Sequence, residues 1–152
     1  MQKYIWTEQY SVGVKEIDEQ HQHFFAIAND IIEIAGQENI EIRELLFKIT
    51  NLNNYVVYHL LTEENIFQRY NYPDARIHVR AHNDYREKMR QFMSEADKVN
   101  GEAREGDLGQ KEGANTKDLA LKIAQFSGDW LMNHILVVDH KYIAFMHEAG
   151  IN

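Results

Sequence analysis

Histidine and carboxylate side chains recur in four short segments of this chain, and both are common ligands of transition metals. The segments are DEQH at residues 18–21, HLLTE at 59–63, HVRAH at 78–82 and HILVVD at 134–139. Each lies in a different stretch of helical periodicity. Four antiparallel helices can direct side chains inward at one point, whereas a single helix cannot. The pattern therefore predicts a metal site inside a helical bundle.

The spacing within these segments fits helix geometry in two cases and conflicts with it in a third. Residues four apart differ by about 40° of rotation, so His59 with Glu63, and His78 with His82, can each chelate a metal from one helix face. His134 and Asp139 are five apart and would diverge by about 140° on a regular helix. We therefore predict a local widening of the last helix between them, a π-type bulge.

The positioning elements follow from apolar residues that recur every three or four positions in a chain with a single proline. This periodicity predicts an all-α, antiparallel up-down-up-down four-helix bundle. We expect one domain over residues 1–152, with an N-terminal arm at 1–17 and helices at about 18–37, 41–70, 73–99 and 116–147. Asp18 is the expected N-cap of the first helix, Pro73 the expected first turn of the third, and Ile77 an expected inward residue.

Four glycines among charged residues predict a mobile surface loop at residues 100–115. The whole chain has 152 residues, enough for one core without disulfides. It has no cysteine, which excludes thiolate metal sites and nucleophiles. A net charge of −8 argues against nucleic acid as a partner, and no secretory signal or membrane span is recognisable, so a cytoplasmic protein that binds no membrane is expected.

Chance offers an alternative explanation for any one of these segments. A single histidine near an apolar face is more often a hydrogen-bonded core residue than a ligand. Four segments on four helices are harder to explain in this way. Burying Glu63 and Asp139 in one core without a counter-charge would be costly, and metal ions supply that counter-charge. His23, His140 and His147 lie outside the pattern, and Glu64 is either an exposed carboxylate or a support for the site.

From Trp6 to about Tyr142 the sequence resembles the hemerythrin family, in particular the single-domain bacteriohemerythrins. Besides the four segments, the similarity includes Val12-Gly13, Tyr72-Pro73 and Trp130-Leu131. This resemblance implies two non-heme iron ions (Fe2+/Fe3+) with an oxo or hydroxo bridge, which bind dioxygen reversibly. It implies the following ligands: His78, His82 and His134 on one iron, His21 and His59 on the other, and Glu63 and Asp139 bridging both.

The resemblance also implies an apolar wall that keeps water and protons away from bound oxygen. Ordinary bundle core would explain the same residues equally well. Leu60 stands where phenylalanine is common in the family, which implies a roomier pocket and faster autoxidation. The residues of this wall are Leu60, Trp130, Leu131 and Ile135, with Phe25 and Tyr142 nearby.

Two other classes of function remain open from the sequence. A ferritin-like di-iron oxidase, ferroxidase or iron-storage protein would use a carboxylate-rich site with Glu-x-x-His pairs, whereas this chain offers five histidines and two carboxylates. Catalytic oxidation of Fe(II) would identify that class, and we expect no enzyme activity here. An oxygen sensor, or a protein that delivers oxygen, would need a protein partner.

Overall fold

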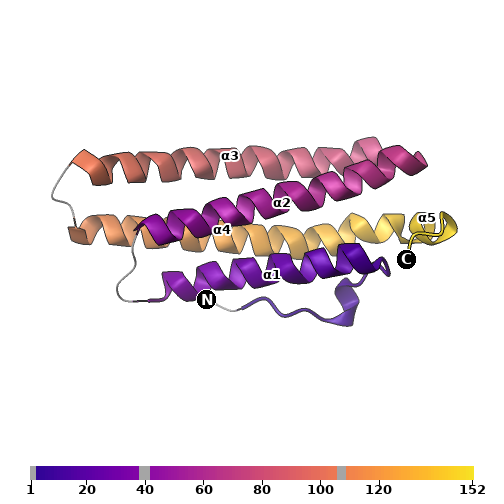
Figure 1. Ribbon diagram of the computed structural model, residues 1–152, viewed down its shortest axis with the longest axis horizontal. Coiled ribbons are helices and arrows are strands. Elements are labelled where there is room, and N and C mark those ends of the chain that lie inside the picture. The colour runs from indigo at the N-terminus through magenta and orange to yellow at the C-terminus, as the bar shows by residue number, and fades with distance from the viewer. Residues whose placement is uncertain (1–2, 38–41, 106–108) are drawn as a thin grey trace.

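In the computed structural model the backbone is described for residues 3–37, 42–105 and 109–152, and side chains for 3–37, 43–98 and 116–152. Two short 3-10 helices are present: η1 (Glu8–Tyr10) in the N-terminal arm and η2 (Asp139–Tyr142) near the C-terminus. The described residues contain no strand. The α-helices are α1 (Lys15–Ala35), α2 (Ile42–Tyr70), α3 (Ala75–Glu105), α4 (Gly109–Val137) and the short α5 (Ile143–Glu148) (Figure 1).

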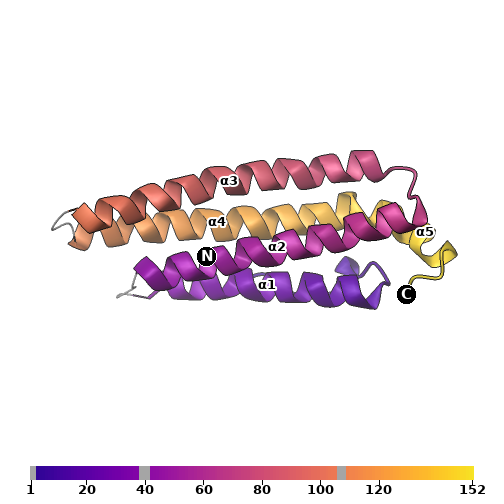
Figure 2. The same ribbon diagram turned by 45° about the horizontal axis from the view of Figure 1, so that its top comes forward.

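The four long helices form an antiparallel bundle, as the sequence predicts. Helix α1 packs against α2 and α4, and α3 packs against the same two helices from the other side. The turned view of Figure 2 shows the four helices side by side, with α5 at the end where α1 begins. Large apolar side chains fill the interior along its length, among them Phe24, Ile31, Leu45, Leu52, Met89 and Ile123. No described helix has the length and hydropathy needed to cross a membrane.

Two predicted helix starts are wrong. Helix α1 begins at Lys15, so Asp18 lies inside its first turn instead of capping it. The Asp18 carboxylate accepts hydrogen bonds from Ser11 Oγ at 2.6 Å and from the Val12 backbone N–H at 2.8 Å. It therefore fastens the arm to the helix. Helix α3 begins at Ala75, two residues after Pro73, because the chain first turns through Asn71, whose φ is 57°.

The predicted loop at residues 100–115 is also wrong where the structure describes it. Helix α3 continues to Glu105 and α4 already begins at Gly109, while residues 106–108 lie outside the described part. Glycine costs only about 1 kcal/mol relative to alanine inside a helix. The intervening Glu, Ala, Arg, Gln and Lys residues favour helix. Extending an existing helix also avoids the cost of nucleation, so the helical backbone continues through the glycines.

The prediction that Ile77 faces the core is wrong, since 66% of its surface is exposed. Its neighbour His78 is buried, and successive residues of a helix point about 100° apart. The buried positions in the described part of α3 are His78, His82, Tyr85, Met89, Phe92 and Ala96. The face of this helix is therefore set by the histidines, which leaves Ile77 on the outside.

The N-terminal arm is held against α1 and α4 by Tyr4. Its backbone N–H donates to Asn29 Oδ1 and its carbonyl accepts from Asn29 Nδ2, both at 2.8 Å. Its hydroxyl donates to Asp129 Oδ1 at 2.9 Å. The Tyr4 ring lies directly over Gly128, where an added Cβ would come within 2.1 Å of ring carbons. The absence of a side chain at Gly128 thus leaves room for the Tyr4 ring to pack on α4.

Substitution of Gly128 by alanine is expected to destabilise the protein, although alanine is the better helix former. The added methyl group must displace Tyr4, at a cost of about 1–3 kcal/mol that exceeds the gain in helix propensity. Urea unfolding should report the loss. In a Tyr4→Ala background the clash is absent, so the same substitution should then stabilise. An equal effect in both backgrounds would refute the role given to Gly128.

Candidate metal centre

The bundle brings the seven predicted ligands to one end. The first turns of α1 and α3 and the last turns of α2 and α4 meet there, next to η2 (Figure 1). Every one of the seven side chains is at most 2% exposed. The residues are His21 on α1, His59 and Glu63 on α2, His78 and His82 on α3, His134 on α4 and Asp139 on η2.

These side chains form two groups that share one carboxylate. Ligand atoms of Glu63, His78, His82 and His134 lie within 4.8 Å of one another, and so do those of His21, His59 and Glu63. Asp139 lies between the two groups. One of its oxygens is 3.4 Å from His21 Nε2, and the other is 3.0 Å from His134 Nε2. The carboxylates of Glu63 and Asp139 thus each lie next to two groups of histidines. One group is His21 with His59, and the other is His78, His82 and His134.

The two pairs spaced by four residues share a helix face, as their spacing predicts. The rings of His78 and His82 have centroids 4.7 Å apart on α3. On α2, His59 Nε2 lies 4.0 Å from a carboxylate oxygen of Glu63. The regular α-helical backbone of both segments is sufficient to position these four side chains.

The predicted π-bulge between His134 and Asp139 is wrong in kind, although the helix does depart from regular geometry there. Helix α4 ends at Val137, and Val138 has a φ of −106°, far from the usual helical value of about −63°. The chain then continues as the tighter 3-10 turn η2. The last helix is interrupted instead of widened, and the interruption brings Asp139 to His134.

The charged groups in the centre stabilise one another. Burial alone would raise the pKa of Glu63 and of Asp139, but the surrounding histidines hold the pKa of both well below its usual range. Burial opposes the charged form of His78, yet Asp139 and Glu63 raise its pKa to about 9. Burial lowers the pKa of His59 to about 3. The centre without metal therefore combines two carboxylates, a protonated His78 and a neutral His59.

Unsatisfied polar atoms indicate that this set fits metal ions. Among the described residues, nine buried nitrogen and oxygen atoms have no hydrogen-bond partner, and all nine belong to this centre. They include Nε2 of all five histidines and oxygens of both carboxylates. Buried polar atoms normally find a partner, because leaving one unpaired costs about 1–3 kcal/mol. Imidazole nitrogens with carboxylate oxygens suit divalent transition metals such as iron.

Several side chains around the centre fix the ligands from outside. Tyr142 is buried, and its hydroxyl donates to Glu63 Oε1 at 2.6 Å. The side-chain oxygen of Gln20 lies 2.9 Å from His59 Nδ1, and Glu64 Oε1 lies 2.8 Å from His82 Nδ1. The sequence does not predict these contacts of Gln20 and Tyr142. The available signals were that Gln20 precedes His21 directly and that Tyr142 follows Asp139 by three residues.

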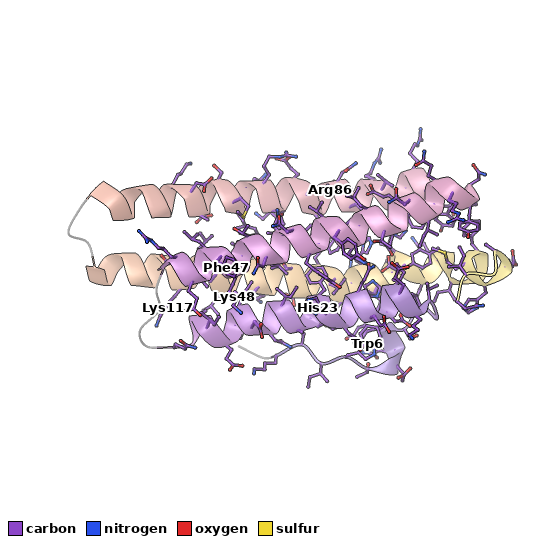
Figure 3. All side chains as sticks on the ribbon, viewed as in Figure 1. Trp6, His23, Phe47, Lys48, Arg86 and Lys117 are labelled. Carbon is purple, nitrogen blue, oxygen red and sulfur yellow. The ribbon has the colours of Figure 1, made fainter. Side chains whose placement is uncertain are left out.

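The residues predicted to form an apolar wall differ in their contacts. Trp130, half-buried, stacks on His134 with ring centroids 4.2 Å apart. Tyr142 stacks on His78 at 5.5 Å. Phe25 contacts Trp6, a residue of the N-terminal arm that Figure 3 labels. The ring centroid of Trp6 lies 6.3 Å from that of His21. Three further residues are completely buried: Leu60, Leu131 and Ile135. The histidines outside the pattern, His23, His140 and His147, are exposed.

Comparison with known proteins gives a consistent result. Residues 12–146 match the family model of the hemerythrin HHE cation binding domain. The chain is 29% identical to a bacteriohemerythrin of Methylococcus capsulatus, with 90% of this chain and 92% of that protein aligned. It is 28% identical to a hemerythrin-like protein of Naegleria gruberi, with 90% of this chain and 88% of that protein aligned.

A solved structure also agrees with the fold. The crystal structure of a wild-type hemerythrin superposes with a TM-score of 0.73 at 25% identity, and the match covers 93% of this chain and 95% of that one. The family model spans the segments that carry all seven converging side chains. The chain therefore belongs to the hemerythrin family.

Proposed function

We propose that this chain binds dioxygen reversibly at a pair of non-heme irons. The observation that carries the proposal is the unequal division of five histidines around two shared carboxylates. Two ferrous ions would supply the electrons with which dioxygen is held reversibly. The proposed ligands are His21 and His59 for one iron, His78, His82 and His134 for the other, and Glu63 and Asp139 for both.

The unequal division supports binding of a small molecule at one iron. The iron held by His21 and His59 receives one protein ligand fewer than its neighbour. A metal must keep such an open position if a small molecule is to reach it. His78, His82 and His134 would complete the protein ligands of the other iron, which would give one electron to dioxygen as its neighbour gives the other.

Exclusion of water supports reversibility. The seven proposed ligands are buried, and Leu60, Leu131 and Ile135 are fully enclosed in the surrounding core. The proposed wall limits access of water and protons, and the low dielectric of such a core strengthens electrostatic interactions within it. The proposal includes a pocket role for these residues together with Trp130, Phe25 and Tyr142. The faster autoxidation expected from Leu60 stays a prediction.

A carrier fits the surroundings of the centre better than an enzyme does. His78 also lines a surface pocket of about 110 Å³, together with Tyr72, Ile77 and Val138. Sites for organic substrates usually measure about 300–1,000 Å³. Five imidazoles with two carboxylates also differ from the carboxylate-rich di-iron oxidases. The proposed activity is therefore binding without turnover.

Anaerobic oxygen titration tests the proposed function. The protein is loaded with two Fe(II) per chain, exposed to stepwise oxygen, and then purged with argon. A visible charge-transfer band that appears with oxygen and disappears on purging is expected. Fewer than two irons per chain, or the absence of the band, would refute the proposal. Continued Fe(II) oxidation over many turnovers would identify a ferroxidase instead.

Metal binding is expected to release protons at pH 7. Burial opposes the charged form of both rings, but the nearby carboxylates outweigh it, so that they raise the pKa of His78 to about 9 and also raise the pKa of His82. Both rings must lose a proton to bind a metal, so roughly one to two protons should leave per pair of irons. The affinity for iron should accordingly fall as the pH drops below about 9.

Anaerobic calorimetry in buffers of different ionisation enthalpy measures this release. Observed heats that vary linearly with the buffer enthalpy would give the number of protons. Heats that do not depend on the buffer at pH 7 would show that both histidines are already neutral without metal.

Storage, delivery and sensing of oxygen would all use this site. Delivery or sensing would add a protein partner. The proposed compartment is the cytoplasm, which suits a chain with no cysteine and hence no disulfide.

A further inference from the structure

The two-histidine and three-histidine groups differ in the side chain that contacts Nδ1 of one of their histidines. His59, in the two-histidine group, has its Nδ1 2.9 Å from the amide oxygen of Gln20. His82, in the three-histidine group, has its Nδ1 2.8 Å from a carboxylate oxygen of Glu64. In both rings Nε2 lies toward Glu63, 4.0 Å from its Oε2 in His59 and 3.0 Å from it in His82. The Nδ1 of His59 therefore contacts a neutral amide, whereas the Nδ1 of His82 contacts a carboxylate.

The amide orientation of Gln20 follows from its other contacts. Its side chain is buried, and its Nε2 lies 3.4 Å from the hydroxyl oxygens of Tyr58 and Thr62. Those hydroxyls accept from the NH₂ group, which leaves the amide oxygen as the acceptor for His59. His21, the other histidine of this group, has a buried Nδ1 with no hydrogen-bond partner. Neither histidine of this group thus has a carboxylate at its Nδ1; the nearest carboxylate in this hydrogen-bond network is Glu16, whose Oε1 lies 3.5 Å from Gln20 Nε2 and so acts on His59 only through the amide.

The charge of Glu64 is maintained by an arginine. The same carboxylate oxygen that faces His82 lies 2.8 Å from Arg86 Nη1. Both side chains are only about a fifth to a quarter exposed, at 21% for Glu64 and 24% for Arg86. Arg86 projects from α3, where Figure 3 labels it. The triad of His82, Glu64 and Arg86 keeps a negative charge directly behind one ligand of the three-histidine group.

A carboxylate behind a histidine makes its imidazole a stronger electron donor to a metal, whereas an amide does so less. A stronger donor stabilises the more highly charged metal. We propose that Gln20 and Glu64 act as positioning residues that make the two irons unequal, so that the iron held by His78, His82 and His134 is oxidised first. In the half-oxidised protein the iron held by His21 and His59 then stays ferrous. This inference rests on the proposed di-iron function.

Exchange of the two supporting groups tests the inference without measuring oxygen binding. Glu64→Gln removes the carboxylate, and Gln20→Glu adds one at nearly constant volume. The control variants are Glu44→Gln on α2 and Gln22→Glu on α1, which make the same changes at exposed positions. Each iron-loaded protein is titrated anaerobically with ferricyanide, which accepts one electron as one Fe(II) becomes Fe(III).

Glu64→Gln is expected to raise the first midpoint potential, and Gln20→Glu to lower the second, while both controls leave the potentials unchanged. In the half-oxidised wild type, the ring N–H resonance of His82 should show the large shift of a ferric ligand, and that of His59 the smaller shift of a ferrous one. The double exchange should reverse this order. The two single variants serve to assign the resonances.

Failure of this inference is distinguishable from failure of the proposed function. A wild-type protein that holds fewer than two irons would overturn the function itself. Two bound irons with unshifted potentials in both variants, or equal shifts in the controls, would overturn only the unequal role of Gln20 and Glu64. If one variant does not fold, the wild-type resonances alone decide, because a ferric signal on His59 contradicts the inference.

Discussion

Replacement of Glu63 by glutamine is expected to leave the protein unable to hold two irons. Glu63 is the one residue common to both groups of converging ligand atoms. Its Oε2 lies 3.0 Å from His82 Nε2 and 3.4 Å from His78 Nε2. Loss of a group that only supports a ligand typically weakens metal binding about 10–100-fold, so loss of a shared ligand should exceed that. The oxygen-dependent band should disappear with the iron.

Iron content after gel filtration measures this effect. Glutamine fills the same volume and can still accept the hydrogen bond of Tyr142, so the helical content of the variant should be unchanged by circular dichroism. Glu44→Gln, an exposed change on the same helix, serves as the matched control and should keep two irons. Retention of two tightly bound irons by the Glu63 variant would show that this carboxylate is not shared between them.

Removal of iron is expected to lower the thermal midpoint by about 10 °C. The nine unpaired buried atoms of the centre make the metal-free fold costly, and bound metal would satisfy them. Free iron at a thousand times its dissociation constant stabilises the fold by about 4 kcal/mol. In a domain of this size each kcal/mol corresponds to about 2–4 °C.

Anaerobic thermal unfolding of Fe(II)-loaded and chelator-treated protein gives the difference. The Glu63→Gln variant provides the control, since iron should change its midpoint much less. Identical midpoints with and without iron in the wild type would mean that the buried histidines and carboxylates satisfy one another without metal.

The parts of the centre that the sequence predicts well are those governed by one helix. His59 with Glu63, and His78 with His82, converge because the α-helical repeat fixes their direction whatever the rest of the chain does. The four-helix architecture follows from the same repeat. Asp139 converges too, but the sequence does not reveal how, because the 3-10 turn depends on packing at the end of α4.

The parts that the sequence does not predict depend on contacts between distant segments. Gln20 reaches His59 across 39 positions of sequence, and Tyr4 reaches Asp129 across 125. Neither contact leaves a periodic signal. Asp18 is a suitable N-cap by type alone, yet it bonds Ser11 and Val12 because the arm folds back over α1. The glycines after Asn100 failed as loop signals because long packed helices override local preference.

All seven converging side chains occupy one end of the bundle. Substitutions at the other end, whether engineered or natural, can therefore change the packing without replacing a ligand. The rest of the bundle interior is packed by apolar residues such as Ile31, Leu45 and Ile49, which are completely buried. Helices there can be lengthened, shortened or repacked in pairs while the ligand end keeps its register. A change in the remote packing should therefore alter the stability of the metal-free fold while the ligand end keeps its affinity for iron, and a new connection or fused domain belongs at the remote end.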